Sequence, residues 1–214
     1  MSETLELGRR VELVPMDGHF HAISIALYQS DGAGGPSYRV HSYSKRHGTP
    51  ERLAAVVRTM AELSGMERVA AEPFTLRFPC GSAHLLACRR AFLEACKLAS
   101  DAAPGTRPLT IHDKKSSRSI RVESIGQGRY QLSADGAEAD KASRLAAIAN
   151  GLVKLGEMGN GGDAGVVFAC GLAHDALVGL LLGRALNVRA ALREEEMAAA
   201  RGVLAAPSAQ AQQP

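Results

Sequence analysis

The sequence FPCGSAH at Phe78–His84 returns as FACGLAH at Phe168–His174, 90 residues further along the chain. Upstream of each copy lies a second match, RLAA, which begins at Arg52 and again at Arg144, 92 residues apart. Two matches in the same order and with nearly the same offset indicate that one structural unit occurs twice. We therefore predict a tandem duplication, with the Cys-Gly-x-Ala-His turn at the equivalent place in each copy.

Each copy carries the same order of secondary-structure signals. Alternating apolar residues predict strands, a Thr49-Pro50 start and a Gly65 stop predict a helix, and Ser82 and Leu172 are expected to open the second helices. In the first copy the predicted strands are 11–15, 19–28, 38–45 and 74–78, and the helices are 49–64 and 82–99. In the second copy they are strands 109–112, 119–125, 129–133 and 166–169, a helix at 140–155 and a long helix from 172.

The expected fold class is α/β in its two-layer α+β form. Each unit reads strand-strand-(strand)-helix-strand-helix, with the helices packed on one face of each sheet. The predicted organisation is a polar N-terminal lead-in, a first unit, a linker, a second unit and a disordered tail, at residues 1–10, 11–100, 101–108, 109–200 and 201–214. This layout is similar to that of imidazoleglycerol-phosphate dehydratase. The paired-histidine metal motifs of that family are absent from the sequence, so the similarity implies a layout and no activity.

Composition narrows the class of protein. The 214 residues are 46% hydrophobic and 22% charged, which is ordinary globular usage. A net charge of +3 is too small to predict nucleic acid as a partner. No apolar run is long enough to cross a bilayer, and the N-terminal residues lack the pattern of a signal peptide. A cytoplasmic protein with no membrane partner is therefore expected.

The repeated turn holds the candidate site residues. Cys80, His84, Cys170 and His174 are the candidate catalytic residues, and Gly81, Ser82 and Gly171 are candidates for binding a cofactor or an anion. If the copies meet about a pseudo-twofold axis, the two Cys-His pairs have the ligand types of a tetrahedral zinc site. A cysteine with a neighbouring histidine as base also suits nucleophilic catalysis, and backbone amides at a helix start suit an anion.

A packing role for the same motif is the alternative. Cysteine is among the most buried residue types, and glycine and alanine permit close packing of helix against strand. The leading hypothesis is a small molecule or anion bound between the two halves at the repeated turns, with enzymatic use of Cys or His left open. The competing hypothesis is a structural or protein-interaction subunit in which the motif only packs. The sequence identifies no cofactor, metal or reaction.

Other features give weaker predictions. All four cysteines are expected to be free thiols, since Cys88 and Cys96 lie about 12 Å apart along one helix. Three histidines, at 19, 21 and 41, are predicted to share a sheet face. Two groups of charged residues are predicted to lie on the solvated surface: the basic residues Lys114, Lys115, Arg118 and Arg121, and the acidic run Glu194–Glu196. The apolar stretch from Leu177 to Val188 predicts a helix buried between the copies or in a homo-oligomer interface.

Overall fold

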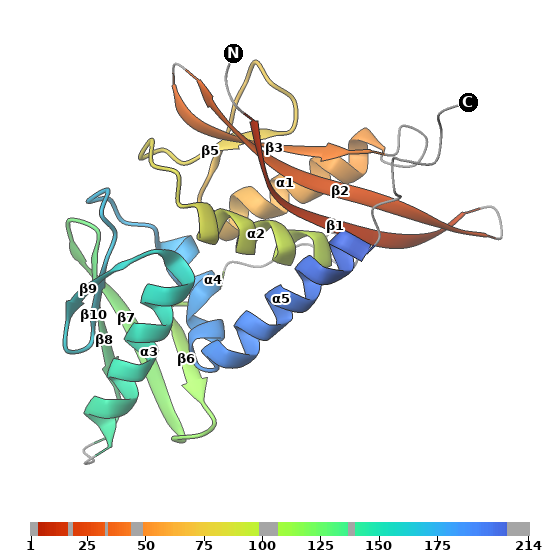
Figure 1. Ribbon diagram of the computed structural model, residues 1–214. Helices are drawn as coiled ribbons and strands as arrows, with labels where there is room; N and C mark the ends of the chain where they lie inside the picture. Colours follow the sequence, from red (N-terminus) through yellow and green to blue (C-terminus); the bar gives the residue numbers. More distant parts are fainter. Residues whose placement is uncertain are drawn as a thin grey trace, which may run out of the picture.

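The protein is an α+β structure of two similar halves, each a five-stranded antiparallel sheet with helices on one face (Figure 1). The computed structural model describes residues 4–16, 19–32, 34–43, 49–98, 107–136 and 140–204, and for residues 11–16, 19–23 and 198–204 it describes the backbone alone. The predicted linker at 101–108 lies mostly outside these residues, as do most of the predicted tail and the side chains of His19 and His21.

The first half contains five strands and two helices. Its elements are β1 (Thr4–Met16), β2 (His19–Gly32), β3 (Gly35–Ser42), α1 (Pro50–Ser64), β4 (Glu67–Arg68), β5 (Thr75–Arg77) and α2 (Leu85–Leu98). The strand order in the sheet is β1-β2-β3-β5-β4. Strand β1 begins at Thr4, so residues 4–10, predicted as a lead-in, belong to the first strand.

The second half repeats this order and adds one helix. Its elements are β6 (Thr110–Asp113), β7 (Arg118–Gly126), β8 (Arg129–Ala134), α3 (Lys141–Gly156), β9 (Gly159–Gly162), β10 (Gly165–Val167), α4 (Asp175–Ala185) and α5 (Val188–Leu204). The sheet order β6-β7-β8-β10-β9 matches that of the first half strand for strand. Tyr38 pairs with Leu76 in one sheet as Tyr130 pairs with Val166 in the other. The fold class is confirmed, and the matching halves are consistent with a duplication.

Besides the early start of β1, the structure departs from the predicted elements in three places. Each half has a short hairpin, β4–β5 or β9–β10, where a single strand was predicted. The second helices begin at Leu85 and Asp175, three residues later than predicted, because the histidine before each has non-helical backbone angles: His84 has φ 45°, and His174 has φ −133° and ψ 60°. The long helix predicted from 172 is broken at Asn187, whose Oδ1 accepts from Ala190 N and so caps α5.

Local sequence explains where the first helix lies. Thr49 Oγ1 accepts a hydrogen bond from Arg52 N at 3.3 Å, and Pro50 occupies the first turn, as predicted. Gly65 ends the helix at φ 69°, a left-handed angle that glycine adopts without a side-chain clash. The buried face of α1 packs on the sheet against a core that includes Ile25, Leu27, Tyr38 and Val40.

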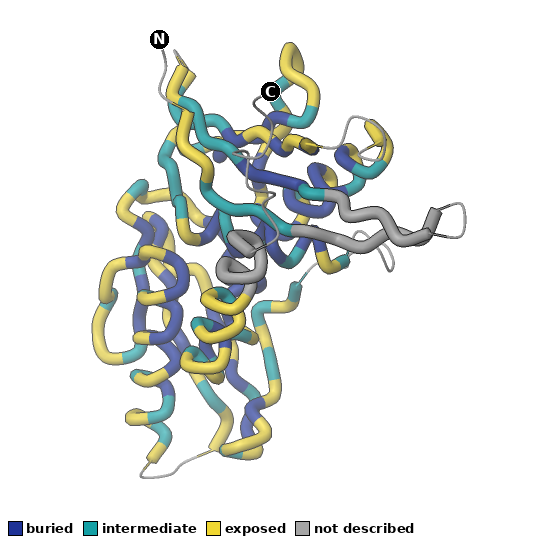
Figure 2. Tube along the Cα trace, turned by 45° about the vertical axis from the view of Figure 1, so that its right-hand side comes forward, coloured by how far each residue is buried: buried dark blue, intermediate teal, exposed yellow. Residues whose placement is uncertain are grey.

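Helices from both halves form the contact between them (Figures 1 and 2). Helix α4 packs against α1 and α2 of the first half and against α3 of its own half, and α5 reaches across to β1. Seven of the eleven residues of α4 are buried, so this helix lies between the two copies, one of the two places predicted for the apolar stretch. Gly151 permits the close approach of α3, since a Cβ there would lie 2.9 Å from Ala185 O. A homo-oligomer stays a prediction.

Polar contacts also cross between the halves. Arg90 of α2 is buried, and its guanidinium binds both carboxylate oxygens of Glu195 of α5, at 2.7 and 3.0 Å. It also donates to Leu155 O at the end of α3. The end of α3 caps α2 in turn, because Glu157 Oε2 accepts from Leu86 N at 3.2 Å. The expectation of a solvated acidic run is therefore wrong for Glu195, whose side chain is 13% exposed.

The basic stretch needs a similar correction. Lys114, Lys115 and Arg121 are exposed, as predicted. Arg118 is buried and pairs with Asp140 at 3.0 Å. Register explains the difference, because Arg118 and the core residue Ile120 lie on the same face of β7, whereas Arg121 lies on the opposite face.

Removing the Glu195 carboxylate leaves the buried Arg90 charge without its partner. We expect Glu195→Ala to lower the free energy of unfolding by about 3–5 kcal/mol, as for other buried ion pairs that lose one member. The exposed neighbour Glu196 supplies the control, since Glu196→Ala is expected to change stability by less than about 0.5 kcal/mol. Urea unfolding monitored by circular dichroism measures both. Equal stability of the two variants would contradict a structural role for this pair.

Candidate metal centre

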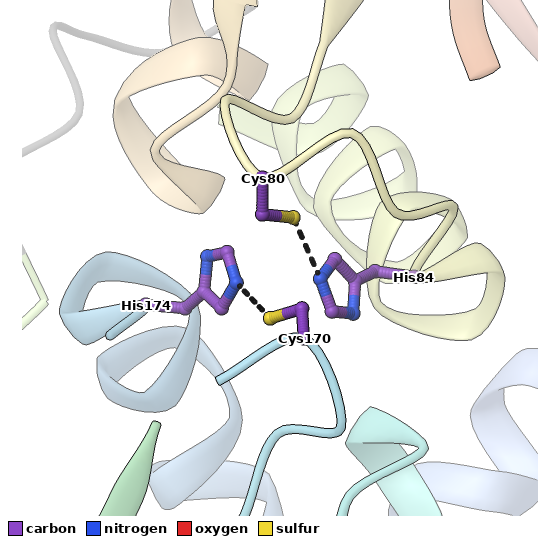
Figure 3. Close-up of side chains that lie close together, drawn as sticks. All are labelled: Cys80, His84, Cys170 and His174. Carbon is purple, nitrogen blue, oxygen red and sulfur yellow. Dashed lines mark hydrogen bonds between the residues drawn. The ribbon is translucent and has the colours of Figure 1, made fainter. Parts of the chain in front are cut away.

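Two Cys-His pairs, one from each half, meet at a single point between the halves (Figure 3). Cys80 and His84 belong to the loop between β5 and α2, and Cys170 and His174 to the equivalent loop between β10 and α4. Their four potential ligand atoms all lie within 4.8 Å of one another. The structure thus brings together all four side chains that the sequence predicts as a cluster.

Each loop folds so that its cysteine and histidine point the same way. The backbone N–H of Gly81 donates to Phe78 O, and that of Gly171 donates to Phe168 O, both at 3.0 Å, which closes a tight turn after each phenylalanine. These turns require φ of 71° and 73° at the glycines, a region that residues with a Cβ rarely adopt. The cysteine sulfur then lies 3.2 Å from His84 Nε2 in one half and 3.1 Å from His174 Nε2 in the other.

The histidines stand just before their helices rather than in the first helical turn. His84 O accepts from Cys88 N, and His174 O accepts from Val178 N, both at 2.9 Å, so each histidine carbonyl starts the helical hydrogen-bond ladder. His84 is half-buried, whereas His174 is buried, with 8% of its surface exposed. His174 is buried because rings from both halves pack against it. The local sequence of one helix start cannot predict such a contact between the halves.

Buried tyrosines hold both loops in place. Tyr38 on β3 donates its hydroxyl hydrogen to Ala83 O in the first loop. The equivalent Tyr130 on β8 accepts from His174 N at 2.6 Å and donates to Asp175 Oδ1 at 2.7 Å. The sequence analysis did not identify these tyrosines, although the 92-residue offset that relates other pairs also relates Tyr38 to Tyr130. They position the loops and do not themselves reach the cluster of sulfur and nitrogen atoms.

Aromatic rings from both halves surround the imidazoles. The centres of the two histidine rings lie 4.7 Å apart. Phe168 packs edge-on against His174, with 4.7 Å between the ring centres. Phe78 contacts His84 at 4.9 Å and reaches across to His174 at 6.0 Å. This apolar shell excludes water from one side of the cluster and strengthens any interaction between charged groups inside it.

Burial also sets the protonation states. It lowers the pKa of His84, and it lowers the pKa of His174 to about 4, with the neighbouring His84 charge adding to the effect. Burial raises the pKa of the Cys170 thiol. Both imidazoles are therefore neutral at pH 7, which is the state in which a histidine nitrogen binds a metal ion. In the absence of a metal ion, the Cys170 thiol keeps its proton and is a poor nucleophile.

The types of the four ligand atoms and the distances between them fit a zinc ion. Zinc bonds of about 2.3 Å to sulfur and about 2.0–2.1 Å to nitrogen place tetrahedral ligand atoms about 3.3–3.8 Å apart. The two Cys-His contacts, at 3.2 and 3.1 Å, are close to that range, and no pair of ligand atoms exceeds 4.8 Å. A shift of about 1 Å across the cluster suffices to complete a tetrahedron, and two thiolates with two imidazoles form a common structural zinc set.

The other predicted site residues shape the turns. The amides of Gly81 and Gly171 donate within their own turns, and Ser82 N donates to Cys80 Sγ at 3.4 Å. A cavity of about 140 Å³ adjoins the cluster on one side, where Cys80 and His174 face Ser64 and Gly65. A ligand smaller than a nucleotide has room there. Within the described residues, no carboxylate hydrogen-bonds either imidazole, so neither Cys-His pair has the third member of a catalytic triad.

Among the side chains that the structure describes, the other cysteines and histidines take no part in this cluster. Cys88 and Cys96 are buried in α2, and all four cysteines are free thiols, as predicted. His41 is exposed on β3 between the rings of Tyr28 and Tyr43. The predicted grouping of His41 with His19 and His21 falls partly outside the described side chains.

Comparisons with known proteins give no family. No protein-family model, no curated protein and no solved structure matches this chain. In the described part of the chain, no helix is both long enough and apolar enough to cross a membrane.

The low pKa of His174 makes the metal-free protein sensitive to acid. The unfolded chain binds a proton at its ordinary pKa of 6.5, whereas the folded protein resists protonation until about pH 4. The His174 contribution to the stability of the EDTA-treated protein is therefore expected to fall as the pH drops from 6.5 to 4, by up to about 1.4 kcal/mol per pH unit, and the lowered pKa of His84 adds to the same trend. Urea unfolding across this range measures the total slope. His174→Gln should reduce this slope, whereas His112→Gln, at an exposed position, should leave it unchanged. Equal slopes in all three proteins would contradict the assignment to His174.

Proposed function

We propose that the protein binds one zinc ion through Cys80, His84, Cys170 and His174, and that this ion joins its two halves. The observation that carries the proposal is the meeting of four ligand atoms, two from each half, within 4.8 Å. Two features support it: the imidazoles are neutral at pH 7, and both cysteines are free. A cytoplasmic location fits the proposal, because a reducing compartment keeps the thiols available.

The proposed role of the ion is structural. Four protein ligands fill a tetrahedral coordination shell and leave no position for a substrate or a water molecule. When bound, zinc would stabilise both thiolates and hold the two loops at fixed distance. The chain's own contribution is to present neutral imidazoles, to exclude water with Phe78 and Phe168, and to fix the loops through Tyr38 and Tyr130.

A second candidate function is the binding of a small molecule or anion between the halves. The cavity of about 140 Å³ beside Cys80 and His174 supports it. In this alternative one of the cysteines acts on the ligand, with its histidine as base. The two candidates differ in what the purified protein contains, and zinc analysis separates them.

Zinc content tests the proposal directly. Protein purified without chelator is expected to hold one zinc ion per chain, measured by inductively coupled plasma mass spectrometry, and His84→Ala and Cys170→Ser should lose it. Zinc bound at 100 times its dissociation constant raises the free energy of unfolding by about 2.7 kcal/mol, so zinc should stabilise the native sequence and neither of these variants.

Cys88→Ala is the matched control, because Cys88 is a buried cysteine of the same half that lies outside the cluster. It is expected to lose some stability through the small cavity created, and to keep its zinc. A native protein without zinc that also fails to gain stability on zinc addition would refute the metal site. Binding that survives both His84→Ala and Cys170→Ser would place the ion elsewhere.

A further inference from the structure

We propose that Cys80 is an oxidation site, where a peroxide initiates formation of a Cys80–Cys170 disulfide and release of the zinc ion. This inference rests on the proposed zinc site and states how oxidation would regulate zinc binding there. The oxidant is a hydroperoxide, with hydrogen peroxide as the simplest member of the class. The product is a covalent link between the two halves in place of a metal link.

Access distinguishes Cys80 from the other cysteines. Cys88 is fully buried and Cys96 is 1% exposed, so neither offers its sulfur to a solute in the folded protein. Cys80 and Cys170 are only partly buried. Cys80 also lines the cavity of about 140 Å³ that adjoins the cluster, next to Ser64, Gly65 and Pro79. A peroxide molecule is small enough to enter this space and would then lie beside Cys80.

Position in the cavity favours Cys80 as the first sulfur to react. The residues that line the cavity beside the cluster include Cys80 and His174 but not Cys170. A peroxide that enters this cavity therefore reaches Cys80 first, and attack begins there.

Cys170 is placed to resolve the oxidised Cys80. The two sulfurs lie within 4.8 Å of each other and must approach to about 2.05 Å to bond. Each cysteine precedes a glycine in a left-handed turn, and a Cβ added to either Gly81 or Gly171 would meet nothing within 4 Å. The Cβ direction of each glycine is therefore open, and a small movement of the two loops is needed to close the gap between the sulfurs.

The chemistry balances in two steps. The Cys80 thiolate attacks one peroxide oxygen; a sulfur–oxygen bond forms, the oxygen–oxygen bond breaks, and the hydroxide that leaves takes up a proton to become water. The Cys170 thiolate then attacks the Cys80 sulfenic acid; the disulfide forms, the sulfur–oxygen bond breaks, and a second hydroxide leaves as water after taking up a proton. Two sulfurs are oxidised, one peroxide is reduced to two waters, and His84 and His174 alone remain to hold the ion, which is released.

Zinc-loaded full-length protein treated with hydrogen peroxide tests the inference. Three changes are expected together: release of one zinc ion per chain to a colorimetric chelator, a mass decrease of two hydrogen atoms, and a Cys80–Cys170 crosslink in the peptide map. Cys80 and Cys88 share the tryptic peptide between Arg77 and Arg89, so fragment ions must locate the link. A thiol reductant followed by zinc should restore the starting protein.

Variants separate the two steps. Cys88→Ala should respond as the native sequence does. Cys170→Ala should stop after the first step, with one added oxygen on Cys80 that a sulfenic-acid reagent such as dimedone captures. Zinc-loaded native protein that gives no Cys80–Cys170 crosslink would overturn the oxidation site and leave the zinc site standing. A native protein that binds no zinc would overturn the zinc site and this inference with it.

Discussion

The meeting of the two Cys-Gly-x-Ala-His loops is the constraint on which the arrangement of the halves depends. Each loop brings a sulfur and an imidazole nitrogen to the same point, and both phenylalanines of the repeated motif pack around the imidazoles. Polar groups lose their water in such a place and need partners. Each cysteine finds its histidine partner in its own half, whereas the ring contacts His84–His174 and Phe78–His174 cross between the halves. Moving the halves apart would therefore expose these rings to water.

A link at this point would act on a long segment of chain. The cysteines are 90 residues apart in sequence. In the chain-entropy model, a link between positions that far apart lowers the entropy of the unfolded chain and so raises the free energy of unfolding by about 4–5 kcal/mol. The Arg90–Glu195 pair and helix α4 already connect the halves without any metal. The proposed ion therefore adds to an existing interface, whereas in the smallest zinc domains the metal replaces a core.

The sequence predicted the fold class and the residues of the cluster because both follow from repetition. Two equivalent loops in two similar units meet if the units pack about a twofold axis, and the ligand types were visible in the motif. The contribution of Tyr38 and Tyr130 was not visible, since it depends on which loop each strand faces. The prediction for Glu195 was wrong for the same reason: its two exposed neighbours have the same charge, and only the packing of α5 against α2 separates it from them.

The two loops differ at three positions, Pro79/Ala169, Ser82/Leu172 and Leu85/Asp175, and the last of these changes how a tyrosine holds each loop. After the histidine comes Leu85 in the first half and Asp175 in the second. Leucine offers no acceptor, and Tyr38 instead donates to the backbone at Ala83, while His84 takes a left-handed φ of 45°. Asp175 accepts from Tyr130, whose oxygen is then oriented to accept from His174 N, and His174 keeps an ordinary φ of −133°. The duplicated motif thus brings the same atoms together in both halves, whereas the tyrosine has a different partner and the histidine a different backbone angle in each half.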